Sequence, residues 1–255
     1  MKRERQAPNG EDGDLTHSAN SDGEIARELD RIRDEYSARA ARGASAGQYG
    51  LFDEAALAHT QSVERAVLGL LKRRGMTRLS EAVVLDVGCG SGLELRRFLD
   101  YGARPENLYG VDLLPKRIDA ARAQHPGIQW SVGSAHQLPF EDERFDIVMC
   151  FTVLSSILDA TARDAVAAEM RRVRKQTGVI ICHDFVYSNP RNPAVRGVSV
   201  SEMRRLFHWP GAQTCSRRVT LAPPLARRVA PRMEWLASAL ERLQFLNTHV
   251  VTMVY

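Results

Sequence analysis

The chain has 255 residues, 44% hydrophobic and 26% charged, a composition typical of a globular protein with a sizeable core. No run approaches the roughly 18 apolar residues that a membrane-spanning helix needs, and Met1–Asp22 is polar, so we expect no secretory signal and a cytoplasmic location. The four cysteines are far apart and form no CxxC pair, which argues against a zinc site or a disulfide framework.

The net charge of +4 is unevenly distributed along the chain. Residues 191–232 contain nine arginines and one acid, Glu202, a local charge of +8 that leaves −4 for the rest. Clustered arginine favours an anionic partner, such as a phosphate, a nucleic acid or a lipid surface. The equally weighted alternative is that these arginines lie on solvated helix faces and bind no partner.

The N-terminal third predicts a tail and two helices. Residues 1–22 are rich in Gly, Asn, Asp and Ser, which predicts a disordered tail. Residues 23–79 predict a helical cap. Its first helix, Glu24–Arg42, carries Ile25, Leu29, Ile32 and Tyr36 at helical spacing, and Gly43–Gly50 is a loop. Its second helix has one apolar face, ends near Gly75 and carries Val63, Ala66, Val67, Leu70 and Leu71 on that face.

Strand and helix patterns then alternate up to Phe185. We expect a capping box at Thr161 and Asp164, opening a helix that ends at Gly178. The expected strands are Ala82–Val87, Leu108–Asp112, Ile128–Val132, Phe145–Phe151 and Val179–Phe185, with helices opening near Gly92, at Pro115 and at Thr161. Such alternation predicts a parallel sheet with helices on both faces.

The C-terminal part is less regular. Val186–Val198 predicts a loop, and Ser199 with Glu202 a second capping box. A strand at Arg218–Leu221, a helix carrying Leu236, Leu240 and Leu243, and a strand at Thr248–Tyr255 follow. The fold class is therefore α/β: a Rossmann-like, mostly parallel sheet of seven strands with helices on both faces and an antiparallel C-terminal edge.

The segment Val84–Gly92, with the sequence VLDVGCGSG, is the strongest functional signal. A hydrophobic strand runs into three alternate glycines and then into a helix, whose N-terminus suits an anionic group. The spacing GxGxG differs from the GxGxxG of dinucleotide enzymes. Asp86 ends the strand, where a carboxylate can meet a cationic amino group, and Asp112 ends the next strand, where an acid can bind both hydroxyls of a ribose.

Together with LYGVDLLPKRIDAAR and GSAHQLPFEDERFDIVMCFTVLSSI, this motif resembles the class I S-adenosylmethionine-dependent methyltransferases, especially the small-molecule branch of the "methyltransferase type 11" kind. The resemblance runs from about Tyr36 to Tyr255 and makes residues 80–255 the methyltransferase domain, with an acceptor-side insertion at about 186–217. It implies S-adenosylmethionine as the cofactor and S-adenosylhomocysteine as its product. The cofactor-binding residues that it implies are Asp86, Gly88, Cys89, Gly90, Gly92, Asp112, Leu113, Ser134, Ala135, Phe151 and Thr152.

Two of these positions are informative in detail. Ser134 stands where the family has an acid beside the adenine, so the contact to the adenine amino group is weaker or comes from elsewhere. Phe151 and Thr152 fall where the family chain passes near the sulfur. By the same likeness, the N-terminal helices close over the cofactor, with Tyr36 and Tyr49 near it.

The catalytic residues are less defined, because a methyl sulfonium arrives activated and the protein mainly aligns the acceptor. A base is needed only for a hydroxyl that must lose its proton. His183 and Asp184, ending the fifth strand, are the candidates, with a purely structural role as the equal alternative. His136 is interpreted as structural or cofactor-proximal. We expect no metal, because no dispersed acid triad is evident.

The loop after the fifth strand is the candidate acceptor site. Its sequence resembles a subgroup with Asn-Pro-x-Asn-Pro-x-x-Arg-Gly at this place, a subgroup associated with bacterial surface-glycan or specialised-metabolite pathways. The candidate substrate-binding residues are Asn189, Arg191, Asn192 and Arg196, where each arginine either grips an anion or ties the loop to the sheet. In the Pro-rich Leu221–Pro231 stretch no strongly amphipathic helix is evident, so we expect no membrane contact there.

We therefore expect a methyltransferase acting on a hydroxyl of a sugar, a lipid- or nucleotide-linked glycan, or a specialised metabolite. The acceptor is expected in either a neutral or an anionic form. One alternative is an RNA methyltransferase that uses the arginine cluster, although Cys150–Val153 lacks the Asn/Asp-Pro-Pro-Tyr motif of many base-methylating enzymes. The other is a non-catalytic, cofactor-binding partner subunit. The acceptor atom and the oligomeric state are left open by the sequence.

Overall fold

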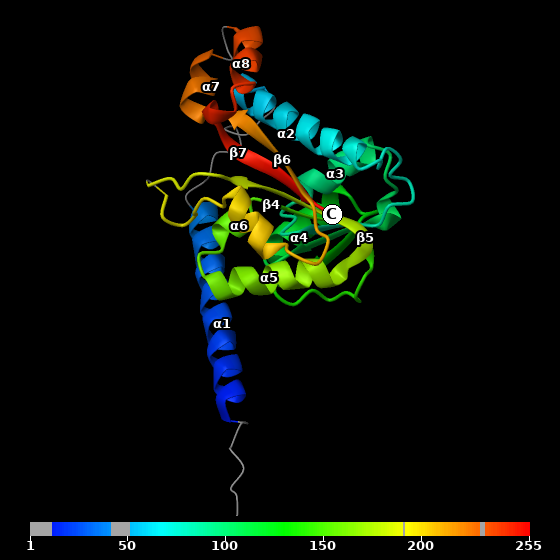
Figure 1. The fold of residues 1–255 in the computed structure, drawn as a ribbon, viewed down its shortest axis with the longest axis vertical. Helices are drawn as coiled ribbons and strands as arrows, with labels where there is room; N and C mark the ends of the chain where they lie inside the picture. The colour runs from blue at the N-terminus through cyan, green and yellow to red at the C-terminus, as the bar shows by residue number, and fades with distance from the viewer. Residues whose placement is uncertain (1–11, 42–51, 191, 230–232) are drawn as a thin grey trace, which may run out of the picture.

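The computed structural model describes residues 12–41, 52–190, 192–229 and 233–255 (Figure 1). The helices are α1 (Asp12–Ala41), α2 (Glu54–Arg73), α3 (Leu93–Asp100), α4 (Pro115–Gln124), α5 (Ala160–Val173), α6 (Val200–Leu206), α7 (Pro223–Val229) and α8 (Glu234–Glu241). The strands are β1 (Val84–Val87), β2 (Leu108–Asp112), β3 (Gln129–Val132), β4 (Phe145–Phe151), β5 (Arg174–Phe185), β6 (Thr214–Leu221) and β7 (Asn247–Val254). Short 3₁₀ turns are η1 (Pro105–Asn107), η2 (Leu154–Ser156) and η3 (Gln244–Leu246).

The strands form one seven-stranded sheet in the order β3-β2-β1-β4-β5-β7-β6. Strands β1 to β5 pair in parallel, and β7 pairs antiparallel with both β5 and β6. This confirms the predicted fold class, with one refinement: the reversed strand is β7, and β6 forms the edge. Since the order reverses between β1 and β4, the crevice at their carboxyl ends is the expected ligand position.

Helices cover both faces of the sheet. A buried cluster that includes Ile25, Val166 and Met203 packs α1, α5 and α6 on one face. A second cluster that includes Val67, Phe98 and Ile118 packs α2, α3 and α4 on the other face. The apolar face predicted for α2 is confirmed, because all five of its expected residues are buried. Figure 1 shows α2 and α5 on opposite sides of the sheet.

Two local predictions were wrong for physical reasons. Asp159, not Thr161, caps α5, because its side chain accepts from Ala162 N–H and places Thr161 inside the helix. Gly178 does not end α5, because the helix ends at Val173 and β5 begins at once at Arg174. A Cβ on Gly178 would lie 2.8 Å from Phe145 O, so glycine lets the strands approach closely at this irregular pairing. Ser199 caps α6 as predicted, since its hydroxyl accepts from Glu202 N–H, whereas the Glu202 carboxylate pairs with Arg196.

The N-terminal predictions meet the structure only in part. Helix α1 begins at Asp12, so residues 12–22 of the predicted tail belong to it, whereas residues 1–11 lie outside the described residues. The loop predicted for Gly43–Gly50 also lies outside them. None of the helices in the described ranges is long and apolar enough to cross a membrane.

Beyond β6 the chain builds a small extension of α7, α8 and η3, which lies at one end of the molecule next to α2 (Figure 1). It has its own apolar cluster, made of Ala55, Leu221, Leu225, Ala226, Val229, Leu240 and Leu246. The sequence did not predict α7, because two prolines open it. Proline is tolerated in the first turn of a helix, where the missing N–H has no partner to lose.

Candidate active site

The glycine loop between β1 and α3 turns sharply at the carboxyl edge of the sheet. Gly88, Gly90 and Gly92 have φ angles of 74°, 56° and 87°, a region that favours glycine. The N–H groups of Gly88 and Cys89 both donate to Val111 O, which joins the loop to β2. Gly90 N–H donates to Asp112 Oδ2 at 2.9 Å. The loop is therefore held by the end of the neighbouring strand.

A cavity of about 730 Å³, including its open mouth, lies against this loop. Its walls are Asp86, Gly88, Cys89, Gly90, Ser91, Leu93, Glu94, Arg117, Phe151 and Thr152. Asp86 is buried, and its Oδ1 has no hydrogen-bond partner. Burial, with the nearby charges of Glu94 and Asp112, raises the pKa of Asp86 well above its ordinary value. An unpartnered buried carboxylate oxygen in a cavity wall suits a cationic ligand group.

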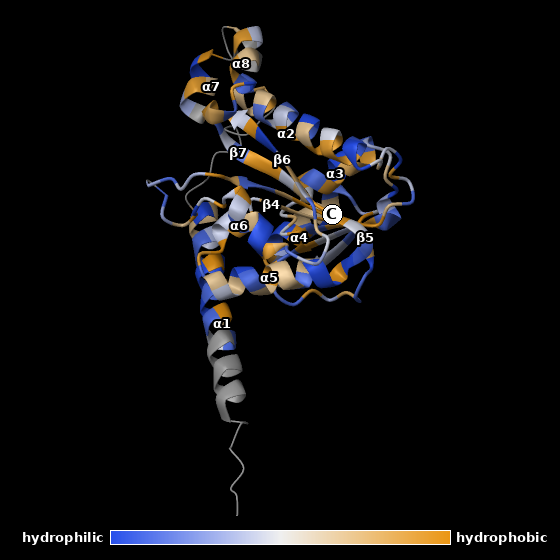
Figure 2. Ribbon diagram, in the orientation of Figure 1, coloured by the Kyte–Doolittle hydropathy of each residue, from blue (hydrophilic) through white to orange (hydrophobic). Residues whose placement is uncertain are grey.

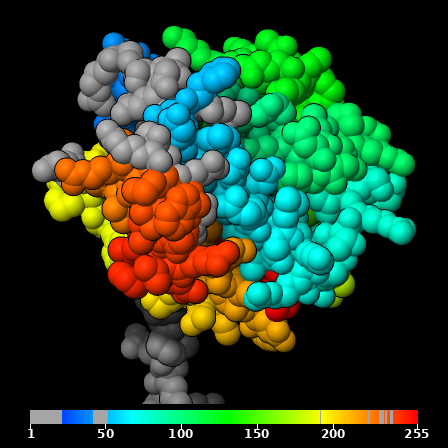
Figure 3. All heavy atoms as spheres, turned by 90° about the horizontal axis from the view of Figure 1, so that it is seen from above, coloured from blue at the N-terminus to red at the C-terminus, as the bar shows by residue number. Residues whose placement is uncertain are grey.

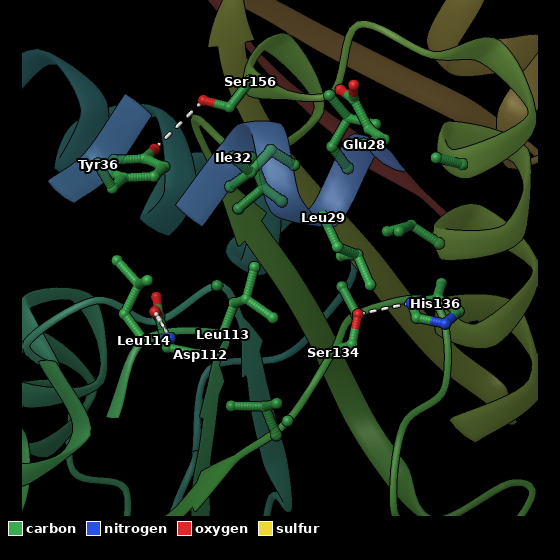
Figure 4. A pocket seen from close by; sticks show the side chains of 18 of the residues that line it. Glu28, Leu29, Ile32, Tyr36, Asp112, Leu113, Leu114, Ser134, His136 and Ser156 are labelled. Atoms are coloured by element: carbon green, nitrogen blue, oxygen red, sulfur yellow. Dashed lines mark hydrogen bonds between the residues drawn. The ribbon is translucent and has the colours of Figure 1, made fainter. Parts of the chain in front are cut away.

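A second cavity, of about 810 Å³ with its mouth, joins the first along Gly88, Arg117, Phe151 and Thr152. Asp112, Leu113, Ser134, Ala135 and His136 line it at the ends of β2 and β3 (Figure 4). The Asp112 carboxylate accepts from Leu114 N–H and Gly90 N–H, both at 2.9 Å, which fixes its orientation. Ser134 and His136 are hydrogen-bonded to each other at 2.5 Å, so Ser134 has a polar partner within the wall.

Helix α1 closes the second cavity from the other side (Figure 4). Glu28 accepts from Leu158 N–H and pairs with Arg31, whose guanidinium donates to Ser156 O. Tyr36 lies 3.3 Å from Ser156 Oγ, and the Arg117 guanidinium lies over its ring. The apolar side chains of Ile25, Leu29 and Ile32 complete this wall. Tyr36 therefore lies in the wall of this cavity, as the predicted closure by the N-terminal helix requires. Tyr49 lies outside the described residues.

Comparisons with known proteins agree with this geometry. Residues 85–182 match the family described as a methyltransferase domain. The uncharacterized methyltransferase YcgJ of Bacillus subtilis is 32% identical over 159 residues, 55% of this chain and 60% of that protein. The demethylmenaquinone methyltransferase of Thermotoga maritima is 31% identical over 108 residues, 42% of this chain and 45% of that protein. These matches confirm the resemblance of the chain to the class I S-adenosylmethionine-dependent methyltransferases, with the family match at residues 85–182.

A solved structure supports the fold. The S-adenosylmethionine-dependent methyltransferase of Mesorhizobium loti superposes with a TM-score of 0.54 at 18% identity, covering 73% of this chain and 95% of that one. The chain spans less than two thirds of the curated relatives that it matches, for example 60% of the B. subtilis protein. The likeness therefore supports the methyltransferase domain at residues 85–182 and the fold, and the acceptor has to be inferred from this chain.

The residues predicted for the cofactor meet at these two cavities, with one exception. Asp86, Cys89 and Gly90 line the first cavity, Asp112, Leu113, Ser134 and Ala135 the second, and Gly88, Phe151 and Thr152 both. Gly92 lines neither cavity; a Cβ there would lie 2.4 Å from the Trp130 ring, so this glycine serves packing. The two walls fit S-adenosylmethionine, because a cationic amino group matches the unpartnered Asp86 oxygen.

Asp184 does not face either cavity. It is fully buried beneath η2, where its carboxylate accepts from Ser155 N–H and Phe185 N–H, both at 3.0 Å. Burial raises the pKa of Asp184 to about 6, against the lowering by these hydrogen bonds. This environment suits a carboxylate that holds the turn after β4 better than a base at the acceptor.

His183 lies on the opposite face of β5, because successive side chains of a strand alternate. Its ring is stacked on that of His249, with centroids 5.2 Å apart, and lies 5.7 Å from that of His59. Phe151, which lines both cavities, is 5.5 Å away on the other side. We call His59, His183 and His249 the histidine cluster. It is separated from the cavities by one aromatic ring.

The histidine cluster is held mostly neutral at physiological pH. Burial, with His249, His59 and Arg97 as neighbours, lowers the pKa of His183 well below its ordinary value. Burial and His59 lower the pKa of His249 to about 3, and burial and Arg97 lower that of His59. His59 Nδ1 is bonded to Thr220 Oγ1 at 2.7 Å, and His183 Nε2 is buried without a partner. Neutral imidazoles of this kind can accept a proton.

The predicted acceptor loop lies away from both cavity walls. The Arg196 guanidinium pairs with Glu202. The backbone N–H of Arg196 donates to Ser155 O at 2.9 Å, which ties the loop to η2. Asn192 accepts from Ala194 N–H, and Asn189 O accepts from Asn192 N–H, so both shape the loop itself. Arg191 lies outside the described residues. Their role in acceptor binding stays a prediction.

Sequence reasoning missed several wall residues. Glu28, Arg117, Val153 and Ser156 line the second cavity, and Glu94 lines the first. Only for Arg117 was a signal present, since it opens the helix after the Asp112 strand. His59 and His249 were missed because the three histidines come from α2, β5 and β7, and their meeting depends on strand pairing.

Proposed function

We propose that this protein transfers the methyl group of S-adenosylmethionine to a hydroxyl oxygen of a small acceptor. The observation that carries the donor assignment is the buried, unpartnered Asp86 Oδ1 in the wall of the glycine-loop cavity. Asp86 would hold the amino group and Asp112 the ribose hydroxyls, while Leu113, Ser134 and Ala135 would surround the adenine. The bound cofactor supplies an activated methyl group on sulfur.

The chain's own residues would align the acceptor and exclude water. The second cavity is closed by the apolar side chains of α1, which restricts access to the donor. Phe151 and Thr152 separate the donor cavities from the histidine cluster, and Thr152 N–H donates to His183 O at 2.7 Å. The bound cofactor would supply the methyl group to the acceptor oxygen, and an imidazole of the histidine cluster would take the hydroxyl proton, relayed past Phe151 by a water molecule.

The acceptor class is a sugar, a lipid- or nucleotide-linked glycan, or a specialised metabolite. The T. maritima relative is named as a demethylmenaquinone methyltransferase, which supports a small-molecule acceptor in general. The position of the histidine cluster next to Phe151 supports a hydroxyl, because only an acceptor that must lose a proton needs a base.

The test measures S-adenosylhomocysteine formation with a panel of hydroxyl-bearing glycans and phenols. With an accepted substrate, we expect His183→Gln and His59→Gln to lower kcat about tenfold or more, the size of general-base assistance. Their affinity for S-adenosylhomocysteine should stay within about twofold. His208→Gln, at an exposed histidine, is the matched control and should match the wild type.

Unchanged turnover in both cluster variants would contradict the base assignment. Methylation of bulk tRNA, with affinity falling steeply as salt rises, would instead favour the RNA alternative. Tight cofactor binding without turnover of any acceptor would favour the partner-subunit alternative.

A further inference from the structure

The extension formed by α7, α8 and η3 exposes large apolar side chains. Met233, Trp235, Leu243 and Phe245 are 41%, 71%, 44% and 74% exposed, all within thirteen consecutive residues. Isolated exposed apolar residues are normal, whereas a contiguous set marks an interaction surface. Figure 3 shows this orange-to-red extension beside α2 on the outside of the molecule.

Helical spacing explains why Trp235 faces outward. Trp235, Ala239 and Arg242 are exposed at positions i, i+4 and i+7, so they follow one face of α8 and its end. Leu240 packs inward in the small apolar cluster of the extension. Leu243, predicted to lie on the same helix as Leu236 and Leu240, is exposed just after α8 ends at Glu241. The exposed set is therefore additional to the residues that hold the extension together.

The charges around these apolar residues are mainly positive. Arg227, Arg228 and Arg242 are exposed, and none makes an ion pair in the described part of the chain. The acid nearest to Arg242, Glu241, is engaged by Arg65 at 3.3 Å and accepts from Thr220 N–H. Figure 2 shows hydrophobic and hydrophilic segments alternating along α7 and α8. Three arginines without acidic partners suit an anionic surface.

We propose that this extension docks on an anionic lipid bilayer, contrary to the expectation for residues 221–231, because its exposed apolar side chains lie beyond that stretch, between Met233 and Phe245. A Trp side chain lies at the headgroup level of a bilayer, where its apolar ring and its polar N–H both find partners, and a Phe side chain adds apolar area to the buried face. Adjacent arginines hold anionic headgroups, each contributing about 1 kcal/mol near the surface. The eight residues of α8 span about 12 Å, far less than a bilayer core, so the helix lies in the interface. A second copy of this chain fits less well, because like-charged arginines would meet.

The docking surface is connected to the histidine cluster. Thr220, at the end of β6, donates its N–H to Glu241 of α8 and bonds through its hydroxyl to His59. Helix α2, which carries His59, also packs against α7. A bilayer held by the extension would therefore lie on the side of the molecule that carries the histidine cluster. The docking itself does not depend on the proposed methyl transfer.

Co-sedimentation with lipid vesicles tests the proposal. We expect the full chain to bind vesicles of phosphatidylcholine with phosphatidylglycerol, and binding to weaken with added salt. Trp235→Ser with Phe245→Ser should weaken binding about tenfold or more, and Arg227→Gln with Arg228→Gln should remove most of the preference for phosphatidylglycerol. Val132→Ser, at an apolar residue that is 50% exposed on β3 at the opposite edge of the sheet, is the control and should bind as the wild type does.

If the thermal unfolding temperature and the affinity for S-adenosylhomocysteine are unchanged in all variants, the substitutions alter docking and not folding. Absence of wild-type binding to these vesicles would overturn the proposal. Vesicle binding by the Trp235/Phe245 variant equal to that of the wild type would also overturn it. A wild-type protein that is a dimer in solution, and that the same variant converts to a monomer, would overturn it as well.

Discussion

The glycines of the loop after β1 differ in what surrounds them. A Cβ at Gly90 would meet only the end of the Arg117 side chain at 3.8 Å, whereas one at Gly92 would lie 2.4 Å from the rigid Trp130 ring. The motif predicted the need for glycine but assigned Gly92 to the cofactor, because nothing in the local sequence shows that Trp130 packs there. Asp86 and Asp112 were predictable, since their places at the ends of adjacent parallel strands follow from the strand pattern.

We therefore expect Gly92→Ala to lower the free energy of unfolding by about 3 kcal/mol, combining positive-φ strain with a clash in the core. Gly211→Ala is the matched control, since Gly211 also has positive φ, 82°, but nothing lies within 4 Å of an added Cβ. The control should lose only about 1 to 2 kcal/mol. Urea denaturation of the two variants makes the comparison, and equal losses would show that Trp130 does not restrict this position.

At the scale of elements, α1 is attached to the segment just after η2 through Glu28, which accepts from Leu158 N–H. Burial raises the pKa of this carboxyl, but the hydrogen bonds from Arg31 and from Leu158 N–H outweigh burial and lower it overall. The sequence predicted α1 from its apolar spacing, yet not this attachment, because Glu28 and Leu158 are far apart in the chain. Glu28 is one of the few acids that are buried in the described residues.

Glu28→Ala should weaken S-adenosylhomocysteine binding about tenfold, because α1 would then spend more time away from the cavity that it closes. Hydrogen exchange of the α1 amides should become faster. Asp30→Ala, which removes an exposed ion pair with Arg33, should leave both unchanged. Slower or unaltered exchange in the Glu28 variant would contradict a closing role for α1.

The histidine cluster joins α2, β5 and β7 and makes their packing sensitive to acid. Its folded-state pKa values are lowered, so above about pH 6.5 the rings are neutral in both states and contribute no pH dependence. As pH falls below that value, the unfolded chain binds protons that the folded chain excludes, and stability is lost until the folded pKa is reached, about 3 for His249. Asp184 acts in the opposite sense, because its folded pKa is raised to about 6.

The comparison of the wild type with His249→Gln isolates the histidine contribution from that of Asp184. As the pH falls from about 6.5 to about 4.5, we expect the free energy of unfolding of the variant to rise relative to that of the wild type. The difference should grow by up to about 1.4 kcal/mol per pH unit, the value for one proton. Urea denaturation at several pH values measures the difference. Parallel curves would show that His249 titrates normally.

At the scale of the whole molecule, the alternating strands and helices were enough to predict the fold. Buried parallel strands such as Phe145–Phe151 are apolar apart from Asp146, and the chirality and order of βαβ units restrict the topology. The donor side of the site followed from the same pattern. The acceptor side did not, because β5 sends His183 and Asp184 to opposite faces and its partners arrive through β7 and α2. The exposed extension was equally hidden, since burial in short helices depends on what packs against them.

The measurement that tests the central claim most directly is calorimetric titration of S-adenosylhomocysteine into the wild type and Asp86→Asn. Asparagine keeps the shape of the side chain and removes the charge that is proposed to hold the amino group. We expect micromolar binding by the wild type, weakened about 10- to 100-fold in the variant, or roughly 1.4 to 3 kcal/mol. The variant should unfold at the same or a higher temperature, because the pKa of Asp86 shows that burial disfavours its charge. No binding by the wild type, or equal binding by both proteins, would contradict the assignment.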